Sequence, residues 1–129
     1  MLSLSYAWYS FYVPSNDITW ASNFTSAKNI SRESNKNMLI FFTGKWCAPC
    51  RIMKREVFTD EEAMKVINSE VVPVIIDIDD PSSSELVNQY KISKTPTTVI
   101  LDSQEKVLEY VTGKIDKNEF LEILNKHKK

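Results

Sequence analysis

The sequence predicts an α/β domain in which a mixed sheet of four to five strands carries helices on both faces. Short unbroken apolar runs, which are typical of buried strands, alternate with segments whose apolar residues recur at helical spacing. Only three residues separate the last two strand candidates, which predicts an antiparallel hairpin, whereas strands separated by a helix are expected to be parallel. A length of 129 residues, with 43% hydrophobic and 26% charged residues, suits one globular domain.

The first elements are a helix and a buried strand. Residues 22–34 have apolar side chains near helical spacing, and Ser22 is the expected N-cap. The run "NMLIFFT" at 37–43 is unbroken and apolar, which predicts a central strand covered on both faces. The short stretch "DITW" at 17–20 is a candidate for a fifth strand at the sheet edge.

The next region, 47–69, predicts a helix that breaks near residues 57–59. Thr59 and Glu62 have the spacing of a capping box, in which the first side chain bonds a first-turn amide and the second reaches back. We therefore expect Thr59 to begin the second half of this helical region.

The second half of the chain contains three more strand candidates and two more helices. Ser83 or Ser84 is expected to cap a short helix, and Asp116, with Glu119 three residues later, is expected to begin the last one. The strands are predicted at 71–79, 94–102 and 106–111.

Charge excludes some classes of partner. The chain has 16 Lys and Arg against 17 Asp and Glu, a net charge of -1, so neither nucleic acid nor an anionic membrane is an expected partner. Residues 1–16 carry no charged side chain, but they are too few and too polar to span a membrane and lack the basic start of a secretory signal. We interpret residues 1–17 as an arm or as the remains of a trimmed signal or anchor, and 18–129 as the domain.

The stretch "GKWCAPCR" contains both cysteines of the chain. Cys47 follows a predicted strand and opens a predicted helix, where unpaired amides and the helix dipole favour a thiolate. Lys45 and Arg51 add positive charge nearby. Cys50 is one turn further on the same face, and Pro49 lies in the first turn, where its missing N–H costs little. The pattern predicts Cys47 as a nucleophile and Cys50 as the thiol that resolves a mixed disulfide.

Other uses of two cysteines are weaker. A structural staple that closes a four-residue loop would remove only about 2 kcal/mol of unfolded-state entropy. A zinc site needs four ligands, and His127 is the single histidine of the chain. A Cu(I) carrier that binds through both thiolates remains a further alternative. The spacing of the pair at a strand-to-helix turn favours redox chemistry.

Pro96 is the second feature of interest. A proline before a strand is usually an edge or turn device. Here the following strand should pair with the strand that leads to Cys47, which would bring Pro96 close to the sulfurs. A cis Thr95–Pro96 bond would leave the backbone groups of Thr95 free for a substrate strand.

The segments "FFTGKWCAPCRIMK" and "KTPTTVILD" together resemble the thioredoxin superfamily, over most of residues 18–129. The similarity extends to bacterial thioredoxin-like proteins of the cell envelope, including the C-terminal domain of the disulfide reductase DsbD. These share a tryptophan before the first helix (Trp20), "FTGxWC", a "vFtD" segment (57–60) and "TPT" (95–97).

The resemblance implies a thioredoxin fold and a thiol–disulfide oxidoreductase that reduces protein disulfides, with Cys47–Cys50 as its redox-active disulfide. Cys47 would attack and Cys50 would resolve, while cis-Pro96 would guide the substrate. Trp46, Pro49, Thr95 and Pro96 would form the substrate-binding surface. The Ala-Pro dipeptide between the cysteines resembles that of reducing members.

The resemblance also implies the setting of the reaction. Substrates would be protein or small-molecule disulfides, and a dithiol protein would supply electrons to a monomer without cofactor or metal. The periplasm or cell envelope is the expected compartment, with the cytoplasm as the alternative. A non-catalytic binding module that uses the same groove with inert thiols remains the second functional hypothesis.

One position departs from the family pattern. Thioredoxins carry a buried aspartate six residues before the first cysteine, and this chain has Phe41 there. The lysine that usually lies on the adjacent strand corresponds to Ile75. The proton relay would then be missing or supplied by Glu56 or water.

Overall fold

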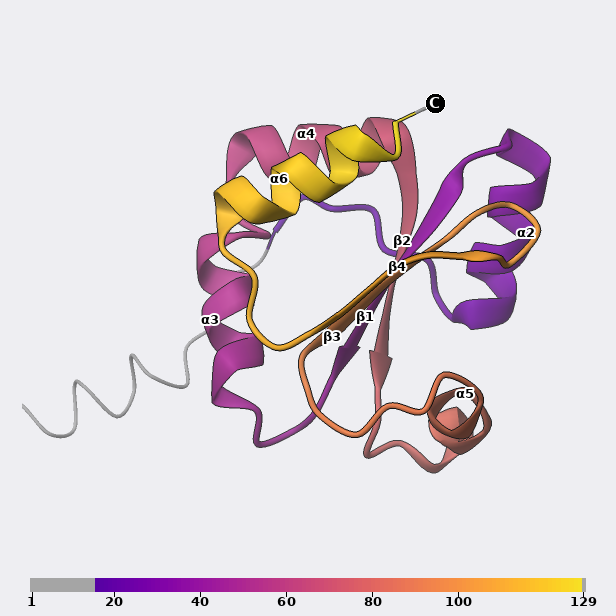
Figure 1. The fold of residues 1–129 in the computed structure, drawn as a ribbon, viewed down its shortest axis with the longest axis vertical. Helices are drawn as coiled ribbons and strands as arrows, with labels where there is room; N and C mark the ends of the chain where they lie inside the picture. Colours follow the sequence, from indigo (N-terminus) through magenta and orange to yellow (C-terminus); the bar gives the residue numbers. More distant parts are fainter. Residues whose placement is uncertain (1–15, 129) are drawn as a thin grey trace, which may run out of the picture.

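The structure is a computed structural model that describes residues 16–128, and it contains one mixed sheet between two layers of helices (Figure 1). The strand order is β2-β1-β3-β4. Strand β1 is parallel to β2 and antiparallel to β3, and β3 and β4 form an antiparallel hairpin. The strands are β1 (Asn37–Thr43), β2 (Val71–Asp77), β3 (Thr97–Leu101) and β4 (Val107–Thr112). The predicted α/β class and the strand directions are confirmed.

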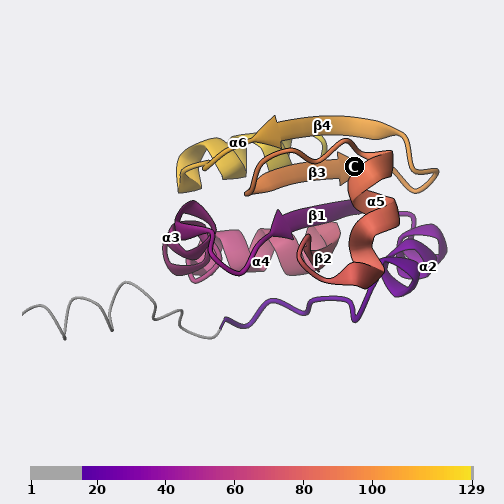
Figure 2. The same cartoon turned by 90° about the horizontal axis from the view of Figure 1, so that it is seen from below.

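The helices cover both faces of the sheet, as predicted. Helices α3, α4 and α6 pack on one face, and α2 and α5 lie on the other (Figure 2). A 3-10 turn, η1 (Pro81–Ser83), precedes α5. The helices are α2 (Phe24–Ser34), α3 (Ala48–Glu56), α4 (Glu61–Glu70), α5 (Ser84–Gln89) and α6 (Lys117–Lys126). Within residues 16–128, none of the helices combines the length and apolar character that crossing a bilayer requires.

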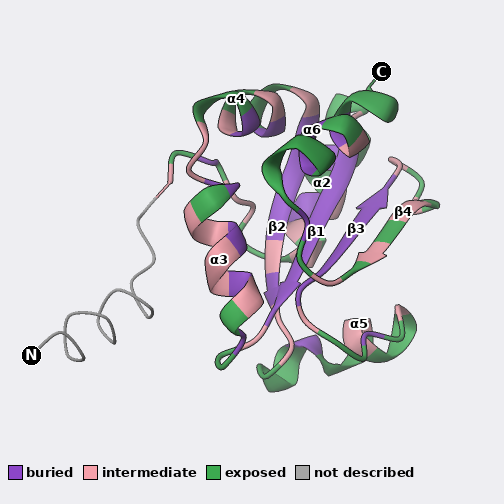
Figure 3. Cartoon of the chain, turned by 60° about the vertical axis from the view of Figure 1, so that its left-hand side comes forward, coloured by how far each residue is buried: buried purple, intermediate pink, exposed green. Residues whose placement is uncertain are grey.

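The core is divided in two by the sheet, because alternate side chains of each strand point to opposite faces. Every residue of β1 is buried, and the central strands are the most continuously buried part of the fold (Figure 3). On the α3 face, the ring of Phe58 makes edge contacts with Trp20, Phe41 and Phe120, at centroid distances of 5.3, 4.9 and 5.7 Å. Both cysteines belong to this same half of the core.

The fifth strand expected at 17–20 is not formed, and the sheet of the described residues has four strands. The segment runs beside β2, where Ala21 N–H donates to Pro73 O at 2.8 Å. Pro73 has no N–H to return, so a ladder cannot continue along this edge. Thr19 N–H instead donates to Asn68 Oδ1 at 2.9 Å.

Two helix starts are displaced from their predicted positions. Asn23, rather than Ser22, caps α2 through its side-chain oxygen. Asp60, rather than Thr59, caps α4, because the Thr59 hydroxyl already donates to the carbonyl of Arg55 in the last turn of α3. In both cases a second capping residue stands next to the predicted one and takes its place.

The predicted N-caps of the last two helices, α5 and α6, are partly confirmed. Asp116 caps α6, as predicted, and its carboxylate accepts from Glu119 N–H at 2.8 Å. Ser83 occupies the N-cap position of α5 but makes no capping bond with its side chain. Its hydroxyl donates to the carbonyls of Asp77 and Asp80 instead.

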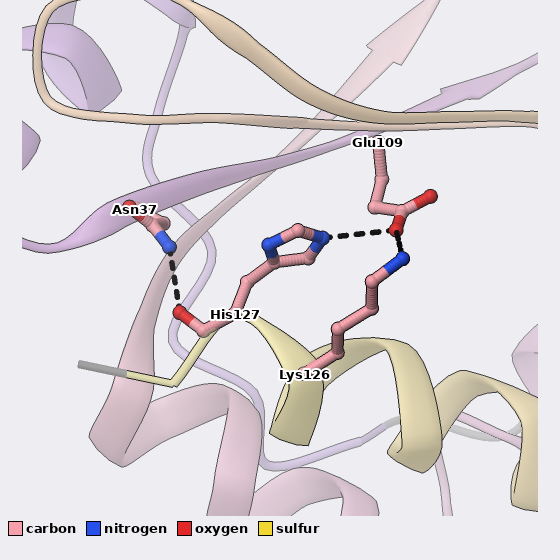
Figure 4. Close-up of polar contacts among 4 residues, drawn as sticks. All are labelled: Asn37, Glu109, Lys126 and His127. Carbon is pink, nitrogen blue, oxygen red and sulfur yellow. Dashed lines mark hydrogen bonds and ion pairs between the residues drawn. The ribbon is translucent and has the colours of Figure 1, made fainter.

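The C-terminal end of α6 is tied to the sheet by polar contacts (Figure 4). Glu109 Oε1 on β4 lies 3.0 Å from Lys126 Nζ and 2.9 Å from His127 Nε2. Asn37 Nδ2 at the start of β1 donates to His127 O at 3.0 Å. The hydrogen bond to His127, followed by that to Lys126, lowers the pKa of Glu109.

Candidate active site

The two cysteines lie at the N-terminus of α3, where the sequence predicts them. Cys47 is the N-cap, with φ -92° and ψ 99°, and its Sγ accepts from Cys50 N–H at 3.1 Å. The sulfurs form a disulfide with an S–S distance of 2.02 Å and a Cα–Cα distance of 5.3 Å. The sulfur of Cys47 therefore occupies the place of a capping oxygen, where a free amide of the first turn points at it.

The cysteines differ in accessibility. Cys47 is 8% exposed and Cys50 is 1% exposed. Trp46, immediately before them, is 84% exposed, which is unusual for a large aromatic side chain. Pro49 is half-buried in the first turn of α3. Cys47 is therefore the more accessible of the two cysteines and follows an exposed indole, whereas Cys50 is covered.

The loop before β3 lies at the same end of the sheet as the cysteine loop. Strand β3 is antiparallel to β1, so it begins where β1 ends (Figure 3). The Thr95–Pro96 peptide bond is cis, the geometry that the sequence predicts, and Pro96 is buried. A Cβ atom added to Gly44 would lie 3.6 Å from Thr95 Oγ1, so the two loops are adjacent. Contact between Pro96 and the sulfurs stays a prediction.

No acid occupies the core position behind the cysteines. Phe41 is fully buried and pairs with Ile75 on β2, as the sequence predicts, and with Thr98 on β3. Glu56 is exposed at the end of α3, so the expectation that it could supply a buried acid near the cysteines is wrong. A proton acceptor for Cys50 at this depth would have to be water or another side chain.

Several charged groups near the site were missed by the sequence reasoning. Lys54 is half-buried one turn after Cys50. Burial lowers the pKa of Lys54, the nearby Asp77 carboxylate acts in the opposite direction, and the charge of Arg51 lowers this pKa further. Asp79 Oδ2 accepts from Lys45 N–H at 2.8 Å. The run "DIDD", which begins at the last residue of β2, was the available signal, because the C-terminal ends of parallel strands meet at one edge.

The part of the chain from 16 to 128 contains no group of three or more His, Cys, Asp or Glu side chains that could hold a metal ion.

Comparison with known proteins assigns the class. A family model described as a thioredoxin-like domain matches residues 24–128, and the chain belongs to this family. The structure superposes on a thioredoxin from Thermus thermophilus with a TM-score of 0.77, at 21% identity, covering 84% of this chain and 85% of the other. These findings show the thioredoxin fold.

The chain is also similar to DsbD proteins. The thiol:disulfide interchange protein DsbD of Pseudomonas fluorescens is 24% identical over an alignment of 119 positions, which covers 83% of this chain but 20% of that protein. The chain thus spans about a fifth of the length of this curated relative. The oxidised C-terminal domain of DsbD from Neisseria meningitidis has a TM-score of 0.69 at 17% identity, covering 85% of this chain and 100% of that domain. A thioredoxin-like fold with a Cys47–Cys50 pair at disulfide distance is consistent with a thiol–disulfide oxidoreductase.

Proposed function

We propose that this protein reduces protein disulfides, with Cys47 as the attacking thiol and Cys50 as the resolving thiol. One observation carries the proposal: the pair closes a disulfide at the N-terminus of a helix, with Cys47 as the more exposed residue. The amide that points at the Cys47 sulfur would stabilise a thiolate there, and the thiolate is the nucleophile in disulfide exchange.

The reaction transfers two electrons in two exchange steps. The Cys47 thiolate attacks one sulfur of the substrate disulfide, forms a mixed disulfide, and releases the other substrate sulfur as a thiolate that takes up a proton. Cys50 then loses its proton and attacks the Cys47 sulfur, so the second substrate thiolate leaves. The substrate is now a dithiol and the protein a disulfide, which a donor dithiol protein must reduce again.

The substrate surface in this proposal consists of Trp46, Pro49, Thr95 and Pro96. The exposed indole of Trp46 offers apolar contact area beside the sulfur. Within the described residues, no protein group hydrogen-bonds to the backbone N–H or C=O of Thr95. An extended substrate segment could pair with these groups, as peptides do with exposed strand edges.

The setting that we propose is the periplasm or cell envelope, with a donor of the thiol:disulfide interchange type. The similarity to DsbD supports this setting, and the similarity to thioredoxins keeps the cytoplasm as the alternative. A reducing role predicts a midpoint potential more negative than the roughly −180 mV of protein disulfide isomerase. Equilibration of the pair with glutathione buffers measures this potential, and a value near that of the oxidant DsbA, about −120 mV, would contradict the reducing direction.

The roles of the two thiols are tested with insulin reduction driven by dithiothreitol. Cys47→Ser should abolish the reaction, because no accessible thiol remains. Cys50→Ser, reduced and then mixed with insulin after dithiothreitol is removed, should still attack but be unable to release the product, so it should accumulate a mixed disulfide through Cys47 that appears as a mass shift under non-reducing conditions.

The controls separate the alternatives. Alkylation of the reduced wild type near neutral pH should modify Cys47 before Cys50, as peptide mass mapping can show. If Cys47→Ser keeps activity and Cys50→Ser traps nothing, the assigned roles are wrong. A wild type that reduces no disulfide would favour the binding-module hypothesis.

A further inference from the structure

The loop between β1 and α3 is held by a carboxylate from the end of β2. The parallel ladder runs to Thr43 opposite Asp77, and Ile78 N–H still donates to Thr43 O at 2.9 Å. Beyond this point Lys45 N–H donates to a side chain, the Asp79 carboxylate, at 2.8 Å. Asp79 is itself fixed, because its N–H donates to Asp77 Oδ1 at 2.8 Å. The strand pairing is thus continued by one side-chain bond into the loop that carries the cysteines.

Gly44 separates this carboxylate from the Thr95 loop. A Cβ atom at Gly44 would lie 3.3 Å from Asp79 Oδ2 and 3.6 Å from Thr95 Oγ1. The first distance is shorter than ordinary van der Waals contact, so the backbone of Gly44 fits closely between the two side chains. The spacing of the cysteine loop from the Thr95–Pro96 loop is therefore set by Asp79 on one side and Thr95 on the other.

The bond between Asp79 and Lys45 contributes more to position than to folding. Both residues are exposed, so water could satisfy the amide and the carboxylate if the bond were absent. A hydrogen bond that merely replaces water contributes little net stability. What water cannot replace is the fixed distance from the end of β2 to the segment that carries Trp46 and Cys47.

We infer that Asp79 is a positioning residue that gives this dithiol its preference for protein disulfides over small ones. It holds the segment with Trp46 and Cys47 at a set spacing from Thr95 and Pro96, and a protein substrate must contact both loops at once. A small disulfide needs only the sulfur of Cys47. Asp79 acts through its bond to the backbone N–H of Lys45. The inference rests on the proposed function and adds a substrate preference to it.

The test compares two neighbouring carboxylates. Asp79→Ala removes the bond to the cysteine loop, whereas Asp80→Ala removes a carboxylate that, among residues 16–128, accepts from Ser82 alone. The reduced proteins are mixed with insulin and, separately, with hydroxyethyl disulfide, and second-order rate constants are measured at equal pH. Loss of one hydrogen bond predicts that Asp79→Ala slows the insulin reaction about three- to tenfold. The hydroxyethyl disulfide reaction should slow by less than about twofold, since it does not depend on the spacing of the two loops.

Two more variants separate position from charge and from misfolding. Asp79→Asn keeps an acceptor and loses the charge, so most of the insulin preference should be retained. Gly44→Ala should lower the preference, and should lower it less in combination with Asp79→Ala, because the two changes act on one contact. Circular dichroism confirms that each variant is folded before rates are compared.

The outcomes are separable from those for the proposed function. If Asp79→Ala slows both substrates equally, changes neither, or matches Asp80→Ala, the inference is wrong while the proposed function stands. If the wild type reduces neither substrate, the proposed function fails and the inference fails with it. A wild type that shows no preference for insulin also overturns the inference.

Discussion

Replacing Phe41 with the aspartate that thioredoxins carry is expected to destabilise this protein rather than restore a relay. Phe41 is fully buried, and its ring meets the edge of Phe58 at a centroid distance of 4.9 Å. Removing most of such a side chain costs about 3–5 kcal/mol, and a buried carboxyl without a partner adds roughly 1–3 kcal/mol. Most domains have a total stability of about 5–15 kcal/mol, so Phe41→Asp should be marginally folded.

The pH dependence of Phe41→Asp identifies the cause. Burial would keep the carboxyl neutral, so the folded-state pKa of the new aspartate would be above its unfolded value. Below the unfolded pKa of about 3.9 both states are protonated and no ionisation penalty applies. As pH rises above that value the unfolded state ionises first, so the destabilisation should grow toward neutral pH.

The measurement is urea unfolding of Phe41→Asp and Phe41→Leu, monitored by far-ultraviolet circular dichroism. The pH is varied from about 4 to about 7.5, a range in which a carboxyl with a raised pKa titrates. Phe41→Leu should lose about 1–2 kcal/mol at every pH, because it leaves a smaller gap and no polar group. If Phe41→Asp is as stable as Phe41→Leu at neutral pH, the site is open to water and the reasoning about a closed core is wrong.

Three other predictions concern the frame around the site. Asp60→Ala should cost about 1 kcal/mol in chemical denaturation, since the Asp60 carboxylate accepts from the first turn of α4, and Thr59→Ala should cost less; equal losses would contradict the assigned cap. Glu109→Gln should cost less than about 1 kcal/mol at neutral pH because the contacts with α6 are partly exposed. The pKa of Glu109 is lowered in the fold, first by its hydrogen bond to His127, so this contribution is present above the unfolded pKa of about 4.3 and is lost as pH falls through the folded pKa; a difference from wild type that persists in acid would contradict this. A chain that begins near Asp17 should keep its melting temperature and its activity, because the sequence predicts that residues 1–16 are dispensable for folding and for chemistry, and a large loss of either would make them part of the domain.

The elements of the fold could be predicted from the sequence where a physical signal is continuous along the chain. The apolar run of β1 predicts a buried strand, and the short spacing of the last two strands predicts an antiparallel hairpin. Both predictions are confirmed. The edge near β2 could not be predicted in the same way. The residue that follows the 17–20 segment, Ala21, bonds to Pro73, and this contact is known only once the strands are in place.

Helix starts were predictable only to within one residue, for a related reason. Ser22 and Asn23 are both good caps, as are Thr59 and Asp60, and the sequence does not rank them. The choice is made by a neighbour: the Thr59 hydroxyl already donates to Arg55 O, so the adjacent carboxylate caps α4.

The residues of the candidate site also differ in how well the sequence predicts them, because some depend on local motifs and others on contacts between distant segments. Cys47, Cys50 and Pro96 could be placed from short motifs, because each motif specifies its own backbone: a helix start for the cysteines and a strand start for the proline. Asp79 lies 34 residues from Lys45, and the bond between them exists because two parallel strands end side by side. The sequence predicts a strand over 71–79, and this prediction alone does not show which loop the acids at its end approach. The register of Thr43 with Asp77 brings Asp79 to the cysteine loop, so the contact on which its proposed positioning role rests is visible in the structure and not in the sequence.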